Sequence, residues 1–280
     1  MKRSVRFLSL LLVFALMLPA SAWAYENPFV SPRGSCDYID GVTVLVSIFV
    51  SDPVHDWNFD RKADKDSYSN IYWRLKTAAD WLTDQAHKYK ASPRIVWDWY
   101  GQKYLYYEFK SSKKIADQEY SYSELRDFIK NNVNLPKIKD YYHADTVIFL
   151  AYYNQTSKDK QAAYTWAWDF DANAYHDYAL EIIWAPDEND NLQLSAATLA
   201  HEMMHCFGAV DLYRASNEVP QSYVDHLKKI KSNDIMYTID YKTPDTIGEE
   251  FTDLDAYYLG LTPSADDQKT YHMSVSSHYQ

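Results

Sequence analysis

Two histidines and a glutamate in one short segment have the spacing to hold a metal ion and to do hydrolytic chemistry. His201 and His205 are four residues apart, so on a helix their side chains lie on one face, about one turn apart. The spacing His-Glu-x-x-His is typical of zinc hydrolases, in which the Glu, here Glu202, takes a proton from a metal-bound water. The alternative is a buried amphipathic helix whose histidines are satisfied within the core.

The residues after the second histidine add to this pattern. Gly208 suits the position just past the end of a helix. Asp211 lies beyond that break and is the expected third ligand, because a carboxylate is a common partner of two histidines in catalytic zinc sites. In the alternative, Asp211 hydrogen-bonds a ligating histidine, and a glutamate further along the chain binds the metal. The glutamates available for that role are Glu218, Glu249 and Glu250.

The chain has 2 cysteines, Cys36 and Cys206. In an exported protein an even pair predicts one disulfide bond, which would tie the N-terminal segment to the histidine helix. Two thiols that form no bond are the alternative. Cys206 is not expected to bind the metal, because on a helix it lies well off the direction shared by His201 and His205.

The first residues have the features of a secretion signal. Lys2, Arg3 and Arg6 precede an apolar run over 7–18 that is short for a membrane span, and residues 22–24 fit the rule for cleavage after Ala24. We therefore expect a secreted, extracellular protein with no membrane contact once the signal is removed. The formal net charge of −11 becomes more negative with the loss of the basic signal. This charge argues against nucleic acid as a partner.

Apolar patterning predicts one domain of strands and helices. A β-branched run over 42–50 predicts a buried strand, and apolar residues at helical spacing predict a long helix over 67–90. Further strands are expected at 94–100 and 104–109, joined as a hairpin, and at 145–153, 163–170 and 178–185. Further helices are expected at 121–132, between Ser195 and Gly208, and at 252–261. The predicted organisation is a signal at 1–24, a leader at 25–40, a catalytic domain at 41–263 and a tail at 264–280.

At this point the chain resembles the metzincin clan of zinc peptidases. The motif residues that carry the resemblance are His201, Glu202, His205, Gly208 and Asp211. The segment 234–237 further along is similar to the clan's Met-turn, and an aspartate as third ligand is similar to snapalysin-like and immune-inhibitor-A-like peptidases. The order of the predicted elements also fits, although the specific motifs cover only a small part of the chain. The resemblance implies an α+β fold with a twisted mixed β-sheet, long helices, an active-site helix and a Met-turn.

The resemblance also implies an activity, that of a zinc metalloendopeptidase. His201, His205 and Asp211 would bind one catalytic zinc ion, and Glu202 would act first as general base and then as general acid. In the clan the edge strand shortly before the active helix runs antiparallel to the substrate, and here that strand would be 163–170. We therefore expect a monomer that binds a peptide or protein substrate along this edge by β-augmentation.

Two features differ from the clan's pattern or add to it. Met236 would form the hydrophobic floor of the site, but the tyrosine that follows it, Tyr237, comes one residue after the methionine and not two, and Tyr241 is another candidate for stabilising the transition state. The segment 32–37 around Cys36 faintly resembles the thiol latch of matrix metalloproteases, which gives a third interpretation of that cysteine.

Other interpretations remain open. Asp169, Asp171 and His176 could bind calcium, although a polar turn between two strands has the same composition. The protein could be an exported binding or surface protein that keeps a peptidase fold without turnover, or a zinc hydrolase that acts on something other than peptides. A gluzincin-type peptidase with a downstream glutamate as third ligand is a further alternative.

Overall fold

The computed structural model describes residue 36 and residues 39–114, 118–155, 164–166, 178–186, 194–240 and 242–274. Some of the predicted features fall outside these residues: the signal at 1–24, most of the leader, the calcium candidates Asp169, Asp171 and His176, and Tyr241.

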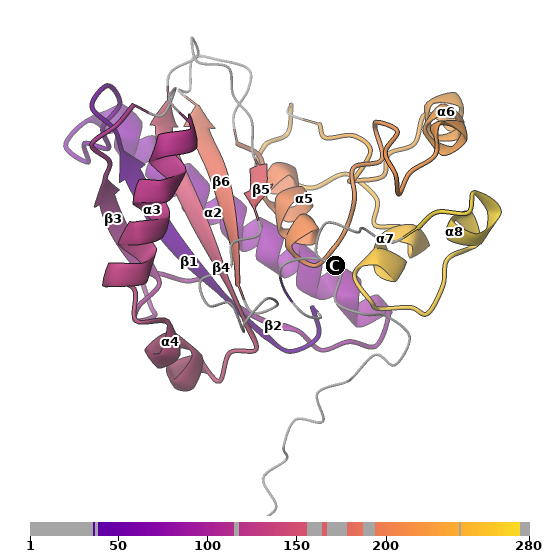
Figure 1. The fold of residues 1–280 in the computed structure, drawn as a ribbon, viewed down its shortest axis with the longest axis horizontal. Helices are drawn as coiled ribbons and strands as arrows, with labels where there is room; N and C mark the ends of the chain where they lie inside the picture. The colour runs from indigo at the N-terminus through magenta and orange to yellow at the C-terminus, as the bar shows by residue number, and fades with distance from the viewer. Residues whose placement is uncertain are drawn as a thin grey trace, which may run out of the picture.

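A six-stranded sheet with helices on both faces forms the centre of the fold (Figure 1). The strands are β1 (Val42–Ser51), β2 (Arg94–Val96), β3 (Tyr106–Lys110), β4 (Thr146–Gln155), β5 (Tyr164–Trp166) and β6 (Tyr178–Pro186). The order across the sheet is β2-β1-β4-β6-β5, and β3 also pairs with β1. β1 runs parallel to β2, β3 and β4, and β4 runs parallel to β6, whereas β5 is antiparallel to β6. The described fold therefore combines a mostly parallel mixed sheet with helices, which confirms the predicted class at this coarser level.

β1 is an interior strand, paired with β2 and β3 along one edge and with β4 along the other, and most of its residues are apolar on both faces. Every residue from Thr43 to Val50 is buried, as expected for a strand covered by helices on both sides. Its neighbour β4 pairs with it from Thr43 opposite Thr146 to Val50 opposite Tyr153. The two predicted strands at 42–50 and 145–153 are thus confirmed, each to within two residues at its ends.

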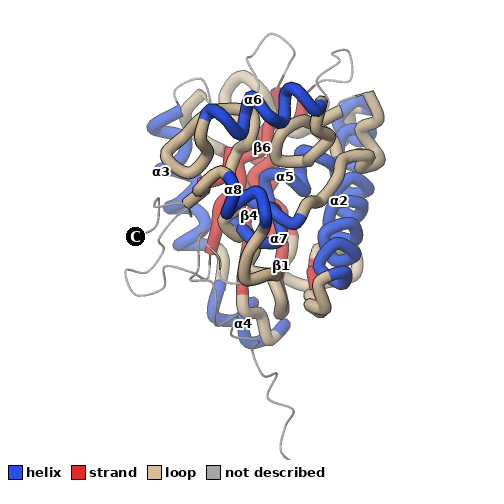
Figure 2. The backbone as a smooth tube through the Cα atoms, turned by 90° about the vertical axis from the view of Figure 1, so that its right-hand side faces the viewer, coloured by secondary structure: helices blue, strands red, loops and turns tan. Residues whose placement is uncertain are grey.

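Helices cover the two faces of this sheet. They are α2 (Lys62–Lys88), α3 (Gln118–Asn132), α4 (Leu135–Tyr142), α5 (Ala196–Cys206), α6 (Gln221–Ile230), α7 (Asp253–Tyr258) and α8 (Asp266–Thr270). Figure 2 shows α2 on one side of the strands and α3 on the other. α2 presents Ile71, Leu75, Ala78 and Leu82 to the core at helical spacing and lies against α5. The sheet and α2 together therefore form the support on which α5 rests.

The predicted hairpin between 94–100 and 104–109 is wrong. β2 pairs with the start of β1, from Val42 opposite Arg94, and β3 pairs with its second half, from Ser47 opposite Tyr106, both in parallel. The segment between them turns at Asp98, whose Oδ1 accepts the amides of Tyr100 and Gly101. The chain thus continues along the same edge of β1 and does not fold back, because that turn lacks the tight geometry that pairs two strands as a hairpin.

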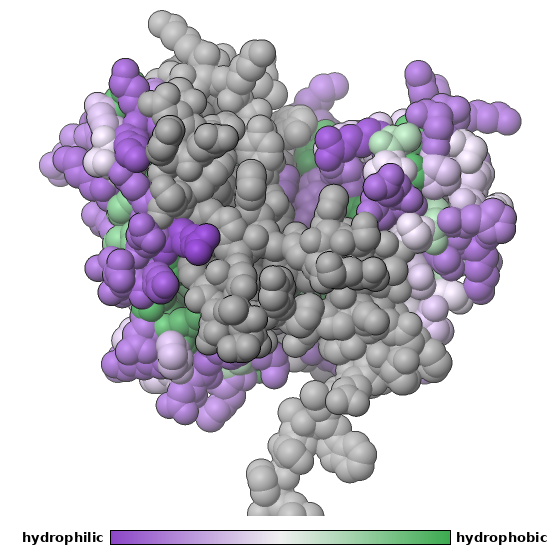
Figure 3. Space-filling view, viewed as in Figure 1, coloured by the Kyte–Doolittle hydropathy of each residue, from purple (hydrophilic) through white to green (hydrophobic). Residues whose placement is uncertain are grey.

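The C-terminal part contains helices that the pattern did not predict. α6 and α8 are joined by a hydrogen bond from the hydroxyl of Tyr223 to Asp267, 3.0 Å. Ala265 and Met273 are buried in the core, so the described part of the expected tail packs onto the domain. Figure 3 shows that most of the described surface on one face is hydrophilic. None of the helices in the described ranges is long and apolar enough to cross a bilayer.

Candidate metal centre

α5 begins and ends where its sequence predicts. The side chain of Ser195 caps its first turn by accepting the amide of Thr198, 3.0 Å. At the other end Gly208 has φ +104°, its amide donates to the carbonyl of His205, and the amide of Ala209 donates to the carbonyl of Met204. These two bonds form a Schellman motif, which needs a left-handed residue at the glycine position. The helix therefore stops soon after its second histidine and the chain reverses.

The reversal brings Asp211 back to the histidines. Leu212 anchors the loop: its side chain is fully buried and its amide donates to the carbonyl of Met236, 2.9 Å. Asp211 is the residue before this anchor and has its carboxylate beside the two imidazoles. The structure thus brings together the three side chains that the sequence singles out as ligands.

The three side chains form a near-equilateral triangle of ligand atoms. Nε2 of His201 lies 3.1 Å from Nε2 of His205, and Oδ1 of Asp211 lies 3.4 Å and 3.1 Å from these two nitrogens. Tetrahedral zinc with nitrogen and oxygen ligands at about 2.0–2.1 Å keeps neighbouring ligand atoms about 3.3 Å apart. The triangle therefore has the size that one such ion requires. Among the described residues, this is the group of histidine, cysteine or acidic side chains whose ligand atoms lie close enough to hold one metal ion.

The tautomers of the two imidazoles also favour a metal site. Nδ1 of His201 lies 2.9 Å from the carbonyl oxygen of Ile235, and Nδ1 of His205 lies 2.8 Å from that of Ala209. A carbonyl only accepts, so in the neutral form each ring has its proton on Nδ1 and a lone pair on Nε2. Oδ1 of Asp211 is buried and accepts no hydrogen bond within the described residues. In that form three electron-pair donors face one point, and this arrangement fits a cation.

The electrostatics of the cluster follow from the same contacts. Burial acts to lower the pKa of His205, but the contact with Asp211 and the charges of Glu202 and Asp211 outweigh it and raise that pKa to about 9. Burial acts to raise the pKa of Asp211, but its contacts with His201, His205 and Tyr213 hold it well below its usual range. The carboxylate of Asp211 is therefore ionised. Without a metal ion, a protonated His205 supplies the positive charge beside it.

The remaining residues of the motif lie close to this triangle. Glu202 follows His201 on α5, is buried, and is near enough for its charge to raise the pKa of His205. Met236 is fully buried in a turn that Asp234 closes, since Oδ1 of Asp234 accepts the amide of Met236, 2.7 Å. That turn also supplies the Ile235 carbonyl that holds His201. The expected Met-turn segment thus contacts His201 through the carbonyl of Ile235.

Tyr237 is half-buried and packs against the core. A tyrosine that contacts the three candidate ligands is Tyr213, whose hydroxyl donates to Oδ2 of Asp211, 2.8 Å. Nη2 of Arg214 lies 2.9 Å from the same oxygen. Burial, followed by the charge of Asp211, raises the pKa of the Tyr213 phenol. The sequence assigned no role to either residue, and the only signal for them was their place two and three positions after Asp211.

The alternative glutamates have other partners. Glu249 accepts the amides of Asp240 and Gly248, and Glu218 accepts the hydroxyl of Ser216. Glu250 is exposed, and its backbone amide donates to the carbonyl of Asn233. None of the three belongs to the converging group found among the described residues.

Cys36 and Cys206 are neighbours in space. The amide of Cys36 donates to the carbonyl of Cys206, 2.9 Å, and both side chains are fully buried. The structure has both as thiols, without a disulfide bond between them. The pairing expected from the sequence therefore remains a prediction, and the backbone contact is compatible with it.

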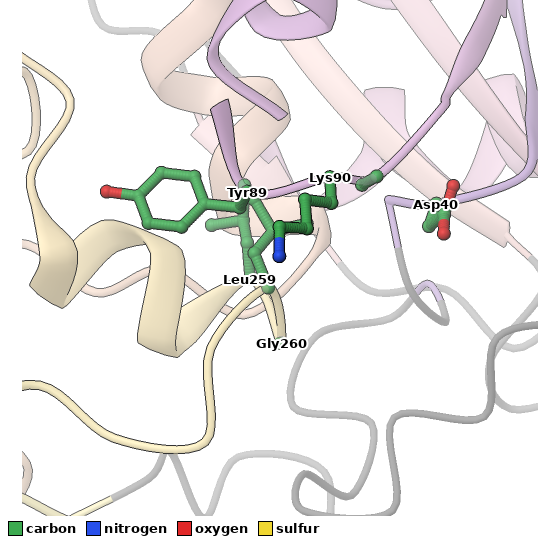
Figure 4. A pocket seen from close by; sticks show the side chains of 7 residues that line it. Asp40, Tyr89, Lys90, Leu259 and Gly260 are labelled. Carbon is green, nitrogen blue, oxygen red and sulfur yellow. The ribbon is translucent and has the colours of Figure 1, made fainter. Parts of the chain in front are cut away.

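Two cavities among the described residues lie apart from the triangle. One, of about 140 Å³, is lined by Tyr89, Lys90 and Leu259 among others, where the end of α2 meets the segment after α7 (Figure 4). The other, of about 390 Å³, has walls formed by Phe59, Tyr68, Tyr100 and Tyr106. Neither cavity includes His201, His205 or Asp211 in its lining.

Comparisons with known proteins add little to this geometry. No protein-family model matches the chain, and no curated protein matches it. A solved structure described as "Structure of a chaperone-substrate complex" is 15% identical over 64% of this chain, with a TM-score of 0.29. This chain spans 26% of the length of that structure. A likeness at this level carries no argument about fold or function.

Proposed function

We propose that this protein is a secreted zinc-dependent endopeptidase of the metzincin type. The observation that carries the proposal is the triangle formed by Nε2 of His201, Nε2 of His205 and Oδ1 of Asp211, with edges of 3.1, 3.4 and 3.1 Å. Its edges match the spacing of ligand atoms around one tetrahedral zinc ion. Both imidazoles are held by backbone carbonyls through Nδ1, which leaves the donors in place for a metal.

The chemistry of the site divides between the ion and the protein. A zinc ion held by these three side chains supplies a Lewis acid that acidifies water and polarises the carbonyl of a peptide bond. Glu202 takes the proton of the attacking water and then delivers it to the leaving amine. Its position next to His201 on α5 and its burial both support this role, because a buried carboxylate beside a cationic centre is well placed to exchange a proton.

The sheet supports a way of binding the substrate. β5 is the last strand of the sheet, so its outer edge presents backbone groups that no other described strand pairs. α5 lies against both β5 and β6. A peptide that adds to β5 as a further strand would run alongside the helix that bears the histidines, with main-chain hydrogen bonds for affinity and pockets for selectivity.

The type of peptidase and its export rest on further features. The order of strand, long helix, strands, active helix, turn with Met236 and closing helix α7 is the order that the resemblance implies. The basic and apolar N-terminal sequence before Ala24 supports secretion.

The proposal is tested with the full secreted protein and an unfolded protein as substrate. The wild type should bind one zinc ion and cleave, and a chelator should stop cleavage. Glu202→Gln should keep the zinc and lose cleavage, whereas His201→Ala should lose both. Full cleavage by Glu202→Gln would overturn the mechanism. Zinc without cleavage of any peptide in the wild type would favour a silent binding protein or a hydrolase of another substrate class.

A further inference from the structure

The two carboxylate oxygens of Asp211 have different surroundings. Oδ1 faces the two histidine nitrogens and accepts no hydrogen bond within the described residues. Oδ2 lies on the other side of the group, where it accepts the hydroxyl of Tyr213 at 2.8 Å and lies 2.9 Å from Nη2 of Arg214. Oδ2 therefore contacts two protein donors, while Oδ1 faces the two histidines.

Local packing fixes the two donors on the side of Oδ2. The buried side chain of Leu212 and its bond to Met236 hold the loop between Asp211 and Tyr213. The guanidinium carbon of Arg214 lies 5.7 Å from the centre of the Tyr213 ring, within the range of a cation–π contact. The two donors therefore contact each other as well as Oδ2, although the arginine side chain stays largely exposed.

We propose that Tyr213 and Arg214 are positioning residues that hold Asp211 as a single-oxygen metal ligand. The inference rests on the proposed metal site. A carboxylate can bind a metal through one oxygen or through both, and a second bound oxygen would fill the position that substrate needs. Two charge-assisted or strong donors on Oδ2 keep that oxygen away from the ion and fix the direction of Oδ1.

The simpler alternative is that the contact of Arg214 with Asp211 is an ordinary surface ion pair. Its side chain is 70% exposed, and exposed pairs contribute little to stability. The two interpretations differ in what they predict for the metal. A surface pair affects neither the affinity for zinc nor the coordination of the ion, whereas a positioning pair affects both.

The experiment measures zinc affinity by competition with a chelator, and the visible spectrum of the Co²⁺-substituted protein, for Tyr213→Phe, Arg214→Gln and the double variant. Loss of such supporting contacts typically costs about 10–100-fold in metal affinity. We expect a loss in this range for Tyr213→Phe, a larger one for the double variant, and a Co²⁺ spectrum that moves toward higher coordination. Arg214→Lys, which keeps a cationic donor, should recover part of the affinity lost in Arg214→Gln.

Tyr141→Phe is the matched control, because Tyr141 and Tyr213 are both about half exposed and Tyr141 lies on α4, outside the cluster. It should behave as the wild type in both measurements. If the wild type binds zinc and Co²⁺ while the Tyr213 and Arg214 variants match it in affinity and spectrum, the positioning role is overturned and the metal site stands. If the wild type binds neither ion, the proposed function itself fails.

Discussion

Nε2 of His201 and Nε2 of His205 face each other at 3.1 Å, and in the neutral rings neither nitrogen has a proton to donate to the other. Each ring already donates through Nδ1 to a backbone carbonyl, from Ile235 and from Ala209. Two lone pairs at this distance repel unless a positive charge lies between them or beside them. A metal ion removes the repulsion, and in its absence a proton on His205 does so in part, in accord with the raised pKa of that residue.

The first prediction concerns the effect of zinc on stability. A ligand that binds only the folded state at 100 times its Kd stabilises that state by about 2.7 kcal/mol. We expect zinc to raise the melting temperature of the chelator-treated wild type and to leave that of His201→Ala unchanged. Differential scanning calorimetry with and without zinc measures both. His87→Ala, which removes an exposed histidine of α2, is the control and should respond as the wild type does.

The second prediction separates Asp211 from the alternative third ligands. Asp211→Asn keeps the shape of the side chain but removes its charge, so we expect at least about a tenfold loss of zinc affinity. Glu250→Gln and Glu218→Gln should bind zinc as the wild type does, because both carboxylates lie outside the converging group. Chelator competition measures all three variants. A loss that appears in a glutamate variant and not in Asp211→Asn would identify that glutamate as the ligand.

The third prediction comes from a buried pair of carboxyl groups next to the Met236 turn. The hydroxyl oxygen of Thr252 lies 2.9 Å from Oδ2 of Asp234 and 3.3 Å from Oδ2 of Asp255. Burial is the main cause that raises the pKa of both groups, and the charge of Asp234 raises that of Asp255 further. The pair therefore retains a proton at pH values at which exposed carboxyl groups have lost theirs.

The sign of the pH dependence follows. Because the folded pKa values exceed the unfolded ones, the stabilising effect is complete below the unfolded value of about 3.9 and is lost as the pH rises through the folded values. We expect the free energy of unfolding of the metal-free protein to fall by about 1–3 kcal/mol as the pH rises from about 4 through the folded pKa of Asp234, which is about 6, since one pKa unit corresponds to about 1.4 kcal/mol.

Asp255→Asn removes one of the two charges and should flatten this part of the profile. Urea titrations at several pH values provide the measurement, and Asp127→Asn, at an exposed position of α3, is the matched control. Parallel profiles for Asp255→Asn and the wild type would mean that the buried pair does not share a proton.

Local patterns were sufficient to predict the parts of the fold whose structure is decided locally. The apolar spacing from Ile71 to Leu82 predicts α2, and Ser195 and Gly208 predict both ends of α5, because caps act on the nearest turn. The return of Asp211 to the histidines follows from the same glycine. The closing helix was expected at 252–261; it spans Asp253–Tyr258, with Thr252 as its cap.

What could not be predicted depends on contacts between distant segments. Whether Tyr106 pairs with Ser47 or folds back on 94–100 is decided by the far strand β1, and alternation of side chains is the same in either case. The donors on Asp211 were missed because their direction is set by the contact of Leu212 with Met236, 24 positions along the chain. The role of Tyr237, expected from its place directly after Met236, stays a prediction; the residue packs against the core next to the turn that Asp234 closes.

The last prediction concerns the two cysteines. Their backbone hydrogen bond keeps the Cα atoms of Cys36 and Cys206 within about 7 Å, close to the upper limit for a disulfide. Air or a disulfide-exchange reagent should therefore oxidise the two thiols to one bond, with loss of two hydrogens, and the bond should stabilise the folded state by about 2–4 kcal/mol because it closes a long loop. Intact mass and melting temperature before and after reduction measure this, with Cys36→Ser as the variant that cannot form the bond.

Cys206 follows His205 directly, so a bond that strained this end of α5 would also disturb a metal ligand. If the cysteines only connect the N-terminal segment to α5, zinc affinity should be the same in the oxidised and reduced forms. An oxidised protein that loses zinc, or a thiol pair that resists oxidation in the folded state, would contradict a purely structural bond.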